Sequence, residues 1–252
     1  MKRIVFFTIF FVLFTIQSYS FDAGKTLTSA NKCYLQKDYD KAADLYSALL
    51  KNNYQTADIY FNLGNTYYKK QDWSSAILYY EKAKRLRPTD SDIEMNLKMA
   101  NLQIIDKIDQ VPQVFYARWY DAVSAKLNSG TWAWLSVIFI WLALICFVGF
   151  LFYKTPRAKQ INFGLGVLSL FFTMFSIIIA VDVNKEEHTH NKGIIFDFSV
   201  YVKSSPESDS KNLFIIHNGS KVKIEDRVNN WYKIKLLNGH EGWVETKVLK
   251  RI

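Results

Sequence analysis

Residues 57–90 read ADIYFNLGNTYYKKQDWSSAILYYEKAKRLRPTD, and this stretch decides the fold of the N-terminal part of the chain. The residues before it carry the same pattern of small, polar and aromatic positions. A shift by 34 residues pairs Ala30 with Gly64, Asn31 with Asn65, Cys33 with Tyr67, Asp38 with Asp72, Ala42 with Ala76 and Tyr46 with Tyr80. A repeat period of roughly 20–50 residues indicates stacked supersecondary units. We therefore expect two copies of one unit.

Each copy is predicted to form two antiparallel helices. Gly64 and Ala76 are small where the helices approach each other, and Pro88 ends the second helix because it lacks a backbone donor. The second copy resembles a tetratricopeptide repeat at Tyr60, Leu63, Gly64, Tyr67, Ala76, Tyr80 and Pro88. The resemblance implies an all-α tetratricopeptide-repeat solenoid within residues 21–110. Two repeats bury too little apolar surface alone, so a capping helix that starts at Asp90 or Ser91 is expected to cover the last face.

The faces of this solenoid that would line a peptide groove carry six candidate contacts. They are Asn31, Tyr34, Phe61, Asn62, Asn65 and Tyr68. The alternative for Phe61 and Tyr68 is packing between helices. A groove that clamps a peptide carboxylate is not expected, because Leu27, Asp92 and Asn96 stand where repeat proteins of that kind carry basic residues.

Three uncharged apolar runs, residues 4–21, 131–153 and 161–181, predict a membrane protein. Residues 1–20, with a basic start and small residues at the end, are predicted to be a secretory signal peptide, with an uncleaved anchor as the alternative. Residues 131–153 and 161–183 are predicted to be transmembrane helices, because each is long enough to cross a hydrocarbon core of about 30 Å.

The loop between the two predicted spans sets the topology. Residues 154–160 hold three basic residues and no acid, and short loops of this kind stay in the cytoplasm. Both flanking regions are therefore expected outside the cytoplasm. Residues 111–130 are predicted to form an amphipathic interfacial helix on membrane lipid, or alternatively a helix that packs on the preceding domain. Residues 184–193 are predicted to be a linker.

Residues 194–252 change to short alternating runs separated by turn signals such as Asn218-Gly219. This pattern favours a small all-β barrel. Five strands are expected, at residues 199–203, 213–217, 221–225, 231–236 and 242–246. With Trp231-Tyr232-Lys233-Ile234 and the run Gly239-His240-Glu241-Gly242-Trp243-Val244, the segment resembles a bacterial SH3-like domain.

The SH3-like resemblance implies a binding module. Some members of that family bind cell-wall peptide or glycan, and others dock partner proteins. Tyr201, Trp231 and Trp243 are the candidate ligand contacts. The alternative is that the two tryptophans form the core and rim of a small barrel.

The composition argues against several other classes of protein. The net charge of +9 is spread along the chain, whereas a nucleic-acid-binding protein would concentrate it on one face, so no nucleic acid is expected. Cys33 and Cys146 lie on different predicted elements, so neither a disulfide nor a shared site is expected. The run from Glu186 to His190 has the wrong spacing for a helical zinc pair, and no catalytic set, cofactor motif or metal site is predicted. Acidic residues such as Asp106 are expected to face solvent.

The order of segments carries a further resemblance. A signal sequence, repeats, the stretch Asn96-Leu97-x2-Ala100-Asn101-x4-Asp106-Lys107-Ile108, two spans entered at Trp132-Ala133-Trp134-Leu135, and an SH3-like end together resemble the BatE family of the Bacteroides-type aerotolerance operon. The resemblance implies work beside von Willebrand factor A-domain membrane proteins, a MoxR-type ATPase and other Bat-operon products. The phenotype it implies is oxygen or stress tolerance.

Two functional hypotheses follow from this domain order. The first is a non-enzymatic scaffold in the bacterial inner membrane, whose repeats and SH3-like domain bind partner proteins in the periplasm. The second is an envelope anchor or sensor whose SH3-like domain binds peptidoglycan.

Overall fold

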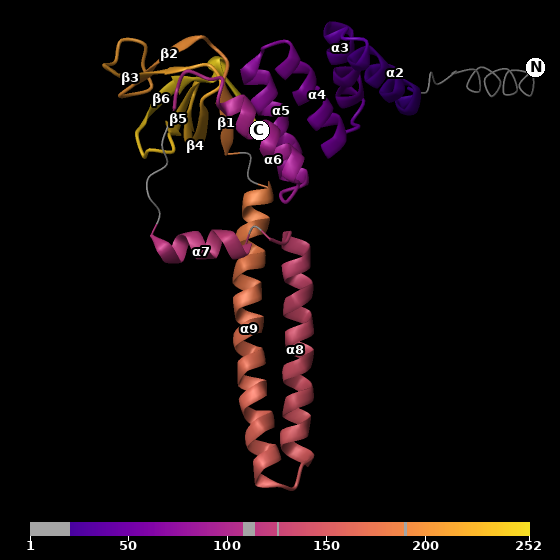
Figure 1. Cartoon of the computed structure of the whole chain (residues 1–252). Helices are drawn as coiled ribbons and strands as arrows, with labels where there is room; N and C mark the ends of the chain where they lie inside the picture. Colours follow the sequence, from indigo (N-terminus) through magenta and orange to yellow (C-terminus); the bar gives the residue numbers. More distant parts are fainter. Residues whose placement is uncertain (1–20, 108–113, 125, 189–190) are drawn as a thin grey trace, which may run out of the picture. The chain divides into compact units, whose positions relative to one another are not determined.

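The computed structural model describes residues 21–107, 114–124, 126–188 and 191–252. The predicted signal peptide lies outside these residues. The described part contains eight α-helices, labelled α2 to α9, followed by seven strands, β1 to β7 (Figure 1). Its all-α repeat region, two long apolar helices and C-terminal antiparallel sheet confirm the predicted multi-domain fold class.

The chain divides into two compact units, and the first unit, which ends at Gln55, contains one helical hairpin. Its helices are α2 (Ala23–Leu35) and α3 (Tyr39–Lys51). Asp22 and Asp38 accept hydrogen bonds from backbone N–H groups in the first turn of each helix, which satisfies donors that the helix leaves unpaired. Lys37 turns the chain between the helices with φ at 62°. The buried face consists of Ala30, Cys33, Ala42, Ala43, Tyr46 and Leu49.

The second unit begins at Thr56 with a hairpin built in the same way. Its first three helices are α4 (Ala57–Lys69), α5 (Trp73–Leu86) and α6 (Ser91–Asn101). Asp72 caps α5, and Asp90 caps α6 by accepting from two backbone N–H groups. Gln71 adopts φ of 61° in the turn, 34 residues after the equivalent position of the first hairpin.

Pro88 ends α5 as expected. The helix stops at Leu86, and Arg87 is extended with φ −135° and ψ 80°, because the ring of a following proline disfavours helical backbone. The predicted capping helix is present as α6, and its buried residues are Ile93, Leu97 and Ala100.

Three helices follow that are rich in exposed apolar side chains. They are α7 (Phe115–Ser124), α8 (Ser129–Phe152) and α9 (Pro156–His188). The helices α8 and α9 are long and apolar enough to cross a membrane, and only 11% and 22% of their most apolar windows are buried. The core helix of a soluble protein would be mostly buried, so these exposed surfaces suggest a membrane anchor. The segment expected to be a linker, 184–193, is helical as far as His188.

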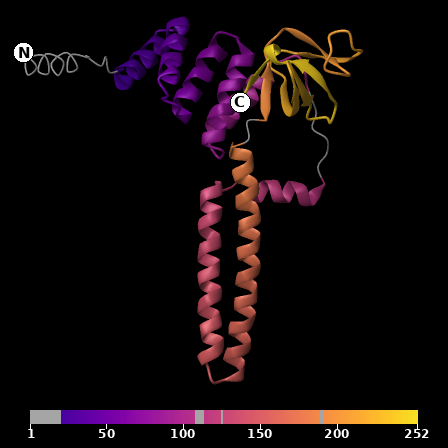
Figure 2. The same cartoon turned by 180° about the vertical axis from the view of Figure 1, so that it is seen from behind.

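The helices α8 and α9 lie side by side as an antiparallel hairpin, visible from both sides in Figures 1 and 2. Small and hydroxyl-bearing side chains let the two backbones approach, as at other helix contacts within membranes. Gly166 faces Ala143 and Cys146 of α8. The buried hydroxyl residues of α9 are Ser169, Thr173 and Ser176.

The C-terminal domain is one antiparallel sheet in the order β3-β2-β6-β5-β4-β1-β7. The strands are β1 (Lys192–Ile195), β2 (Ser199–Lys203), β3 (Asn212–His217), β4 (Lys221–Val228), β5 (Trp231–Lys235), β6 (Glu241–Glu245) and β7 (Leu249–Arg251). The five predicted strands correspond to β2 through β6. Strands β1 and β7 were not expected, and they pair with each other to extend the sheet beyond β4.

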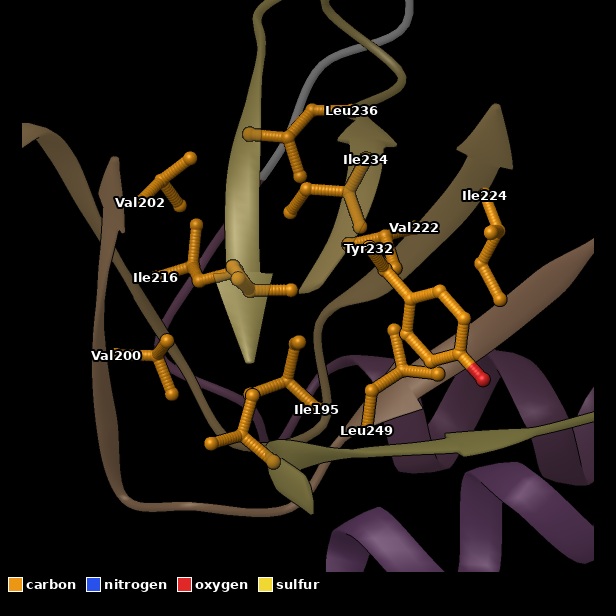
Figure 3. Packing of buried hydrophobic residues seen from close by; sticks show 12 residues of the cluster. Ile195, Val200, Val202, Ile216, Val222, Ile224, Tyr232, Ile234, Leu236 and Leu249 are labelled. Atoms are coloured by element: carbon orange, nitrogen blue, oxygen red, sulfur yellow. The ribbon is translucent and has the colours of Figure 1, made fainter. Parts of the chain in front are cut away.

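The core of this domain comes from alternate residues of the strands, because successive side chains point to opposite faces. Figure 3 shows these side chains converging from several strands. The cluster consists of Ile195, Val200, Val202, Ile216, Val222, Ile224, Tyr232, Ile234, Leu236, Val244, Val248 and Leu249.

Candidate functional site

Two of the candidate groove residues hold their own hairpins together. Tyr46 Oη donates a hydrogen bond to Asn31 Oδ1 at 2.6 Å, and Tyr80 Oη donates to Asn65 Oδ1 at 2.7 Å. Both tyrosines are 1% exposed, and burial raises the pKa of Tyr46 to about 12. Asn65 also accepts from Asn96 Nδ2 at 2.8 Å, which ties α6 to α4. These amide oxygens therefore position helices in addition to any contact with a ligand.

Two further candidates pack against the turn of each hairpin. Tyr34 meets Tyr39 edge to face with ring centroids 5.5 Å apart, and Tyr68 meets Trp73 in the same way at 5.2 Å. The two pairs are separated by 34 residues, so the repeat extends to side-chain geometry. All four rings are half-buried, and each edge-to-face pair packs the connection between the two helices of its hairpin.

The remaining groove candidates, Phe61 and Asn62, are half-buried on α4. Phe61 lies 5.9 Å from the ring of Tyr80, and both Phe61 and Tyr68 pack against the buried cluster of the second unit. The structure thus places four candidates on α4, and two, Asn31 and Tyr34, on α2 of the first unit.

The SH3-like candidates lie on the outer face of the sheet. The alternation that buries Tyr232 and Val244 leaves Trp231 and Trp243 half-buried on the opposite face. The tryptophans are therefore not the barrel core, whose aromatic residue is Tyr232 (Figure 3). Lys233 on β5 lies opposite Trp243 on β6, which places a cationic side chain beside the indole.

A network of charges lies next to Trp243 on the same face. Glu241 is 2.9 Å from Lys233 and 2.5 Å from Lys235, and Glu225 lies 3.5 Å and 3.8 Å from the same two ammonium groups. Hydrogen bonds from Lys235 and Lys233 lower the pKa of Glu241 to about 2. This carboxylate therefore stays ionised at any physiological pH and gives the aromatic face a fixed polar border.

The third candidate, Tyr201, continues this face toward the edge of the sheet. Its side chain is 52% exposed on β2, opposite Ile215 of the edge strand β3, which is 44% exposed. Exposed aromatic rings beside aliphatic and charged groups can stack on a sugar or pack against an extended peptide. The outer face of β6, β2 and β3 therefore has the chemistry of a recognition surface.

The prediction that Asp106 faces solvent is wrong. Its side chain is 16% exposed. It accepts hydrogen bonds from the backbone N–H of His217 at 2.6 Å and from Ser220 Oγ at 2.5 Å, and His217 Nδ1 is 2.8 Å away. A single sequence offers no signal for this contact, because the partners are more than 100 residues apart. Asp109, which the sequence also predicts to face solvent, lies outside the described residues.

The described part of the chain brings together no cluster of metal ligands: no group of three or more His, Cys, Asp or Glu side chains there could hold a metal ion. The side chains from Glu186 to His190 are not among those described. Cys33 and Cys146 are both buried and free.

Comparison with protein families identifies the two binding modules. Residues 36–91 match the tetratricopeptide repeat, and residues 199–250 match the bacterial SH3 domain. The search of curated proteins found no match to this chain. The chain therefore contains a tetratricopeptide repeat and a bacterial SH3 domain, and this combination fits a protein-binding scaffold or adaptor.

Proposed function

We propose that this protein is a non-enzymatic, membrane-anchored scaffold. Its repeat region and its SH3-like domain bind partner proteins on the periplasmic side of the bacterial inner membrane. Tethering both modules to one hairpin raises the effective concentration of the second contact once the first has formed.

The observation that carries this proposal is the position of the hairpin between the two modules. Two antiparallel apolar helices, α8 and α9, separate the repeat from the SH3-like domain. If both helices cross the bilayer, the chain leaves it on the side where it entered, so both modules share one compartment. The turn between the helices carries Lys154, with Arg157 and Lys159 in the first turn of α9, which favours a cytoplasmic turn.

The resemblance to the BatE family supports a specific set of partners. By that resemblance, von Willebrand factor A-domain membrane proteins and other Bat-operon products contact the modules, within an assembly that supports oxygen or stress tolerance. A photo-crosslinking residue placed at Asn62 in native membranes tests this, with the same residue at the 88% exposed Lys25 as control. We expect von Willebrand-type proteins to be captured at position 62 and not at position 25. Capture of only porins and cell-wall fragments would contradict the proposal.

The exposed aromatic face of the sheet supports a second candidate function, an envelope anchor that binds peptidoglycan. Trp243→Ala and Tyr201→Ala should each reduce cosedimentation of the full chain with purified peptidoglycan at least severalfold. Leu237→Ala is the matched control, because Leu237 is 46% exposed on the same domain but lies in the turn after β5. Equal retention of all three variants would remove this candidate.

The short helix α7 supports a contact with membrane lipid. None of its residues is buried, and Phe115, Tyr116 and Trp119 are 77%, 64% and 58% exposed. Tyr120 Oη donates to Asp182 Oδ2 of α9 at 3.0 Å, which fixes α7 beside the hairpin. An amphipathic helix attached to a membrane anchor in this way is suited to the lipid interface. Quenching of Trp119 fluorescence by brominated lipid would test this placement.

A further inference from the structure

One face of helices α5 and α6 is covered by the SH3-like domain. Ile77 of α5, Ala100 of α6 and Ile194 of β1 are each fully buried. They belong to one continuous cluster that draws on the repeat and on the sheet. Its buried members are Ala76, Ile77, Leu78, Tyr80, Leu97, Ala100, Ile194 and Ile252. Strand β1 lies beside α5 and α6 in Figure 1 and again from behind in Figure 2.

Two charged contacts join α5 to the domain at the border of this cluster. Lys221 Nζ of β4 is 2.5 Å from Glu81 Oε1 of α5, with side chains 29% and 12% exposed. Arg85 Nη1 of the same helix donates to the backbone carbonyl oxygen of Ile252 at 3.0 Å. Polar groups this well covered are costly unless paired, so the contacts also specify which face of the domain docks.

A third contact closes the far side of the cluster, after the end of α6. The Asp106 carboxylate binds the backbone N–H of His217 and the hydroxyl of Ser220, as described above. Between these two residues, Gly219 adopts φ of 87° and lies against the side chain of Ile104, too close for any β-carbon. The turn after β3 is thus shaped for close approach to the segment that follows α6.

A helical repeat normally ends in a unit whose outer face is polar, because an uncovered apolar face is insoluble. Here the face formed by Ile77, Leu97 and Ala100 is apolar, and strand β1 and the end of β7 lie against it. We propose that the SH3-like domain is the C-terminal cap of the second repeat, so that α4 to α6 and the sheet fold and bind as one body. The interaction surface on α5 and α6 therefore has the chain's own SH3-like domain as its partner.

Side-chain exposure shows that capping is compatible with ligand binding. Docking uses β1, the start of β4, the chain after β7 and the end of β3 at His217, whereas the side chains of Tyr201 and Trp243 lie on the outer face of β2 and β6. Tyr201 is 52% exposed with the domain docked, so this face remains accessible. The cap is the same whichever ligand that face binds.

Hydrogen exchange of the full chain in detergent micelles tests the cap. Lys221→Glu changes only the SH3-like domain, and the readout is the amide exchange of α5 and α6. Lys223→Glu is the matched control, because this exposed lysine lies two residues further along the same strand. We expect Lys221→Glu to speed exchange in α5 and α6 by about fivefold or more, since loss of the cap opens the unit it covers, and Lys223→Glu to leave it unchanged.

The charge-swapped double variant distinguishes loss of this contact from general misfolding. Glu81→Lys with Lys221→Glu restores an opposite-charge pair and should return the exchange of α5 and α6 most of the way to that of the native chain. Unchanged exchange of α5 and α6 in Lys221→Glu would overturn the proposal. So would a double variant in which exchange is as fast as in the single one, because the effect would then not come from the pair.

Discussion

The two helical hairpins have the same local structure and differ in how closely their helices pack. Each has an aspartate cap on its second helix, a left-handed residue before that cap and a buried tyrosine bonded to an asparagine across the hairpin. The second hairpin has Gly64 where the first has Ala30. A β-carbon at Gly64 would lie 2.6 Å from a ring carbon of Tyr80. The comparison shows that the local pattern fixes the hairpin, while one small residue sets how closely its helices approach.

The difference continues on the outside of the second hairpin. Its tyrosine bridge is tied to α6 through Asn96, and α5 carries the SH3-like domain. The second hairpin therefore contacts both α6 and the SH3-like domain. We expect substitutions in it to affect more distant residues than equivalent substitutions in the first hairpin.

The largest effect is expected at the close approach. Gly64→Ala should destabilise the second hairpin by about 2 kcal/mol, because overpacking a buried contact forces the tyrosine ring or the helix to move. Ala30→Gly, the reverse change in the first hairpin, should cost only about 0.5–1 kcal/mol through backbone entropy. Denaturant titration of the full chain followed by hydrogen exchange of each hairpin separates the two. Equal costs would show that the hairpins are packed alike.

Acid should loosen the contact that Asp106 makes with the sheet, and with it the packing of the second hairpin and α6. Burial alone would raise the pKa of Asp106, but hydrogen bonds from Ser220 and His217 outweigh it and lower the pKa below 3.8. A carboxyl with a depressed folded-state pKa stabilises fully above its unfolded value, and that stability is lost as the pH falls through the folded value. Exchange in α5 and α6 should therefore rise as the pH drops below about 4. Asp106→Asn should weaken docking by roughly 1.5 kcal/mol at neutral pH and flatten this acid dependence; a native-like acid profile in that variant would assign the transition to another group.

Removing the bridging hydroxyls should distinguish the hairpins by a smaller margin. Tyr80→Phe should cost about 1 kcal/mol, because a half-buried acceptor, Asn65, loses a partner. Tyr46→Phe should cost less, since Asn31 is exposed and water can replace the hydroxyl. Double-mutant cycles with Asn65→Ala and Asn31→Ala measure the two coupling energies. A larger coupling energy in the first hairpin would contradict the expectation that the Tyr80–Asn65 hydrogen bond contributes more to stability.

The smallest effect is expected at the two left-handed turns, and it should be the same in both. Lys37→Gly and Gln71→Gly each relieve the strain of a side chain at positive φ, partly offset by the greater freedom of glycine in the unfolded chain. A stabilisation of about 0.5 kcal/mol is expected for each. Thermal unfolding of the two variants checks this, and destabilisation in only one of them would mean that its turn has a different role.

Much of the fold could be predicted from local pattern. The 34-residue period, the cap at Asp90 and the stop at Pro88 each follow from contacts within a few residues, and so do the five central strands. Strands β1 and β7 were missed because they are three or four residues long and are recognisable only through the pairing that holds them. Tyr201, Trp231 and Trp243 could be named as candidate contacts from the sequence. The face of the sheet on which each lies depends on the strand register, which the sequence alone did not show.

The interface between repeat and sheet could not be predicted, for a physical reason. A carboxylate such as Asp106, or a pair such as Glu81 and Lys221, looks the same in sequence whether it faces water or a distant domain. Burial and partner choice arise only after the chain has brought residues more than 100 positions apart together. Signals of this kind lie in tertiary contacts, which a single sequence does not encode locally.

The turn of the membrane hairpin limits how this protein can communicate. Only Tyr153, Lys154 and Thr155 lie between α8 and α9. If that turn is the cytoplasmic end, it offers a cytosolic protein too small a surface to bind. Any coupling to the cytoplasm would then have to pass through other membrane proteins that contact the lipid-facing sides of α8 and α9. The protein would act through lateral contacts within the bilayer.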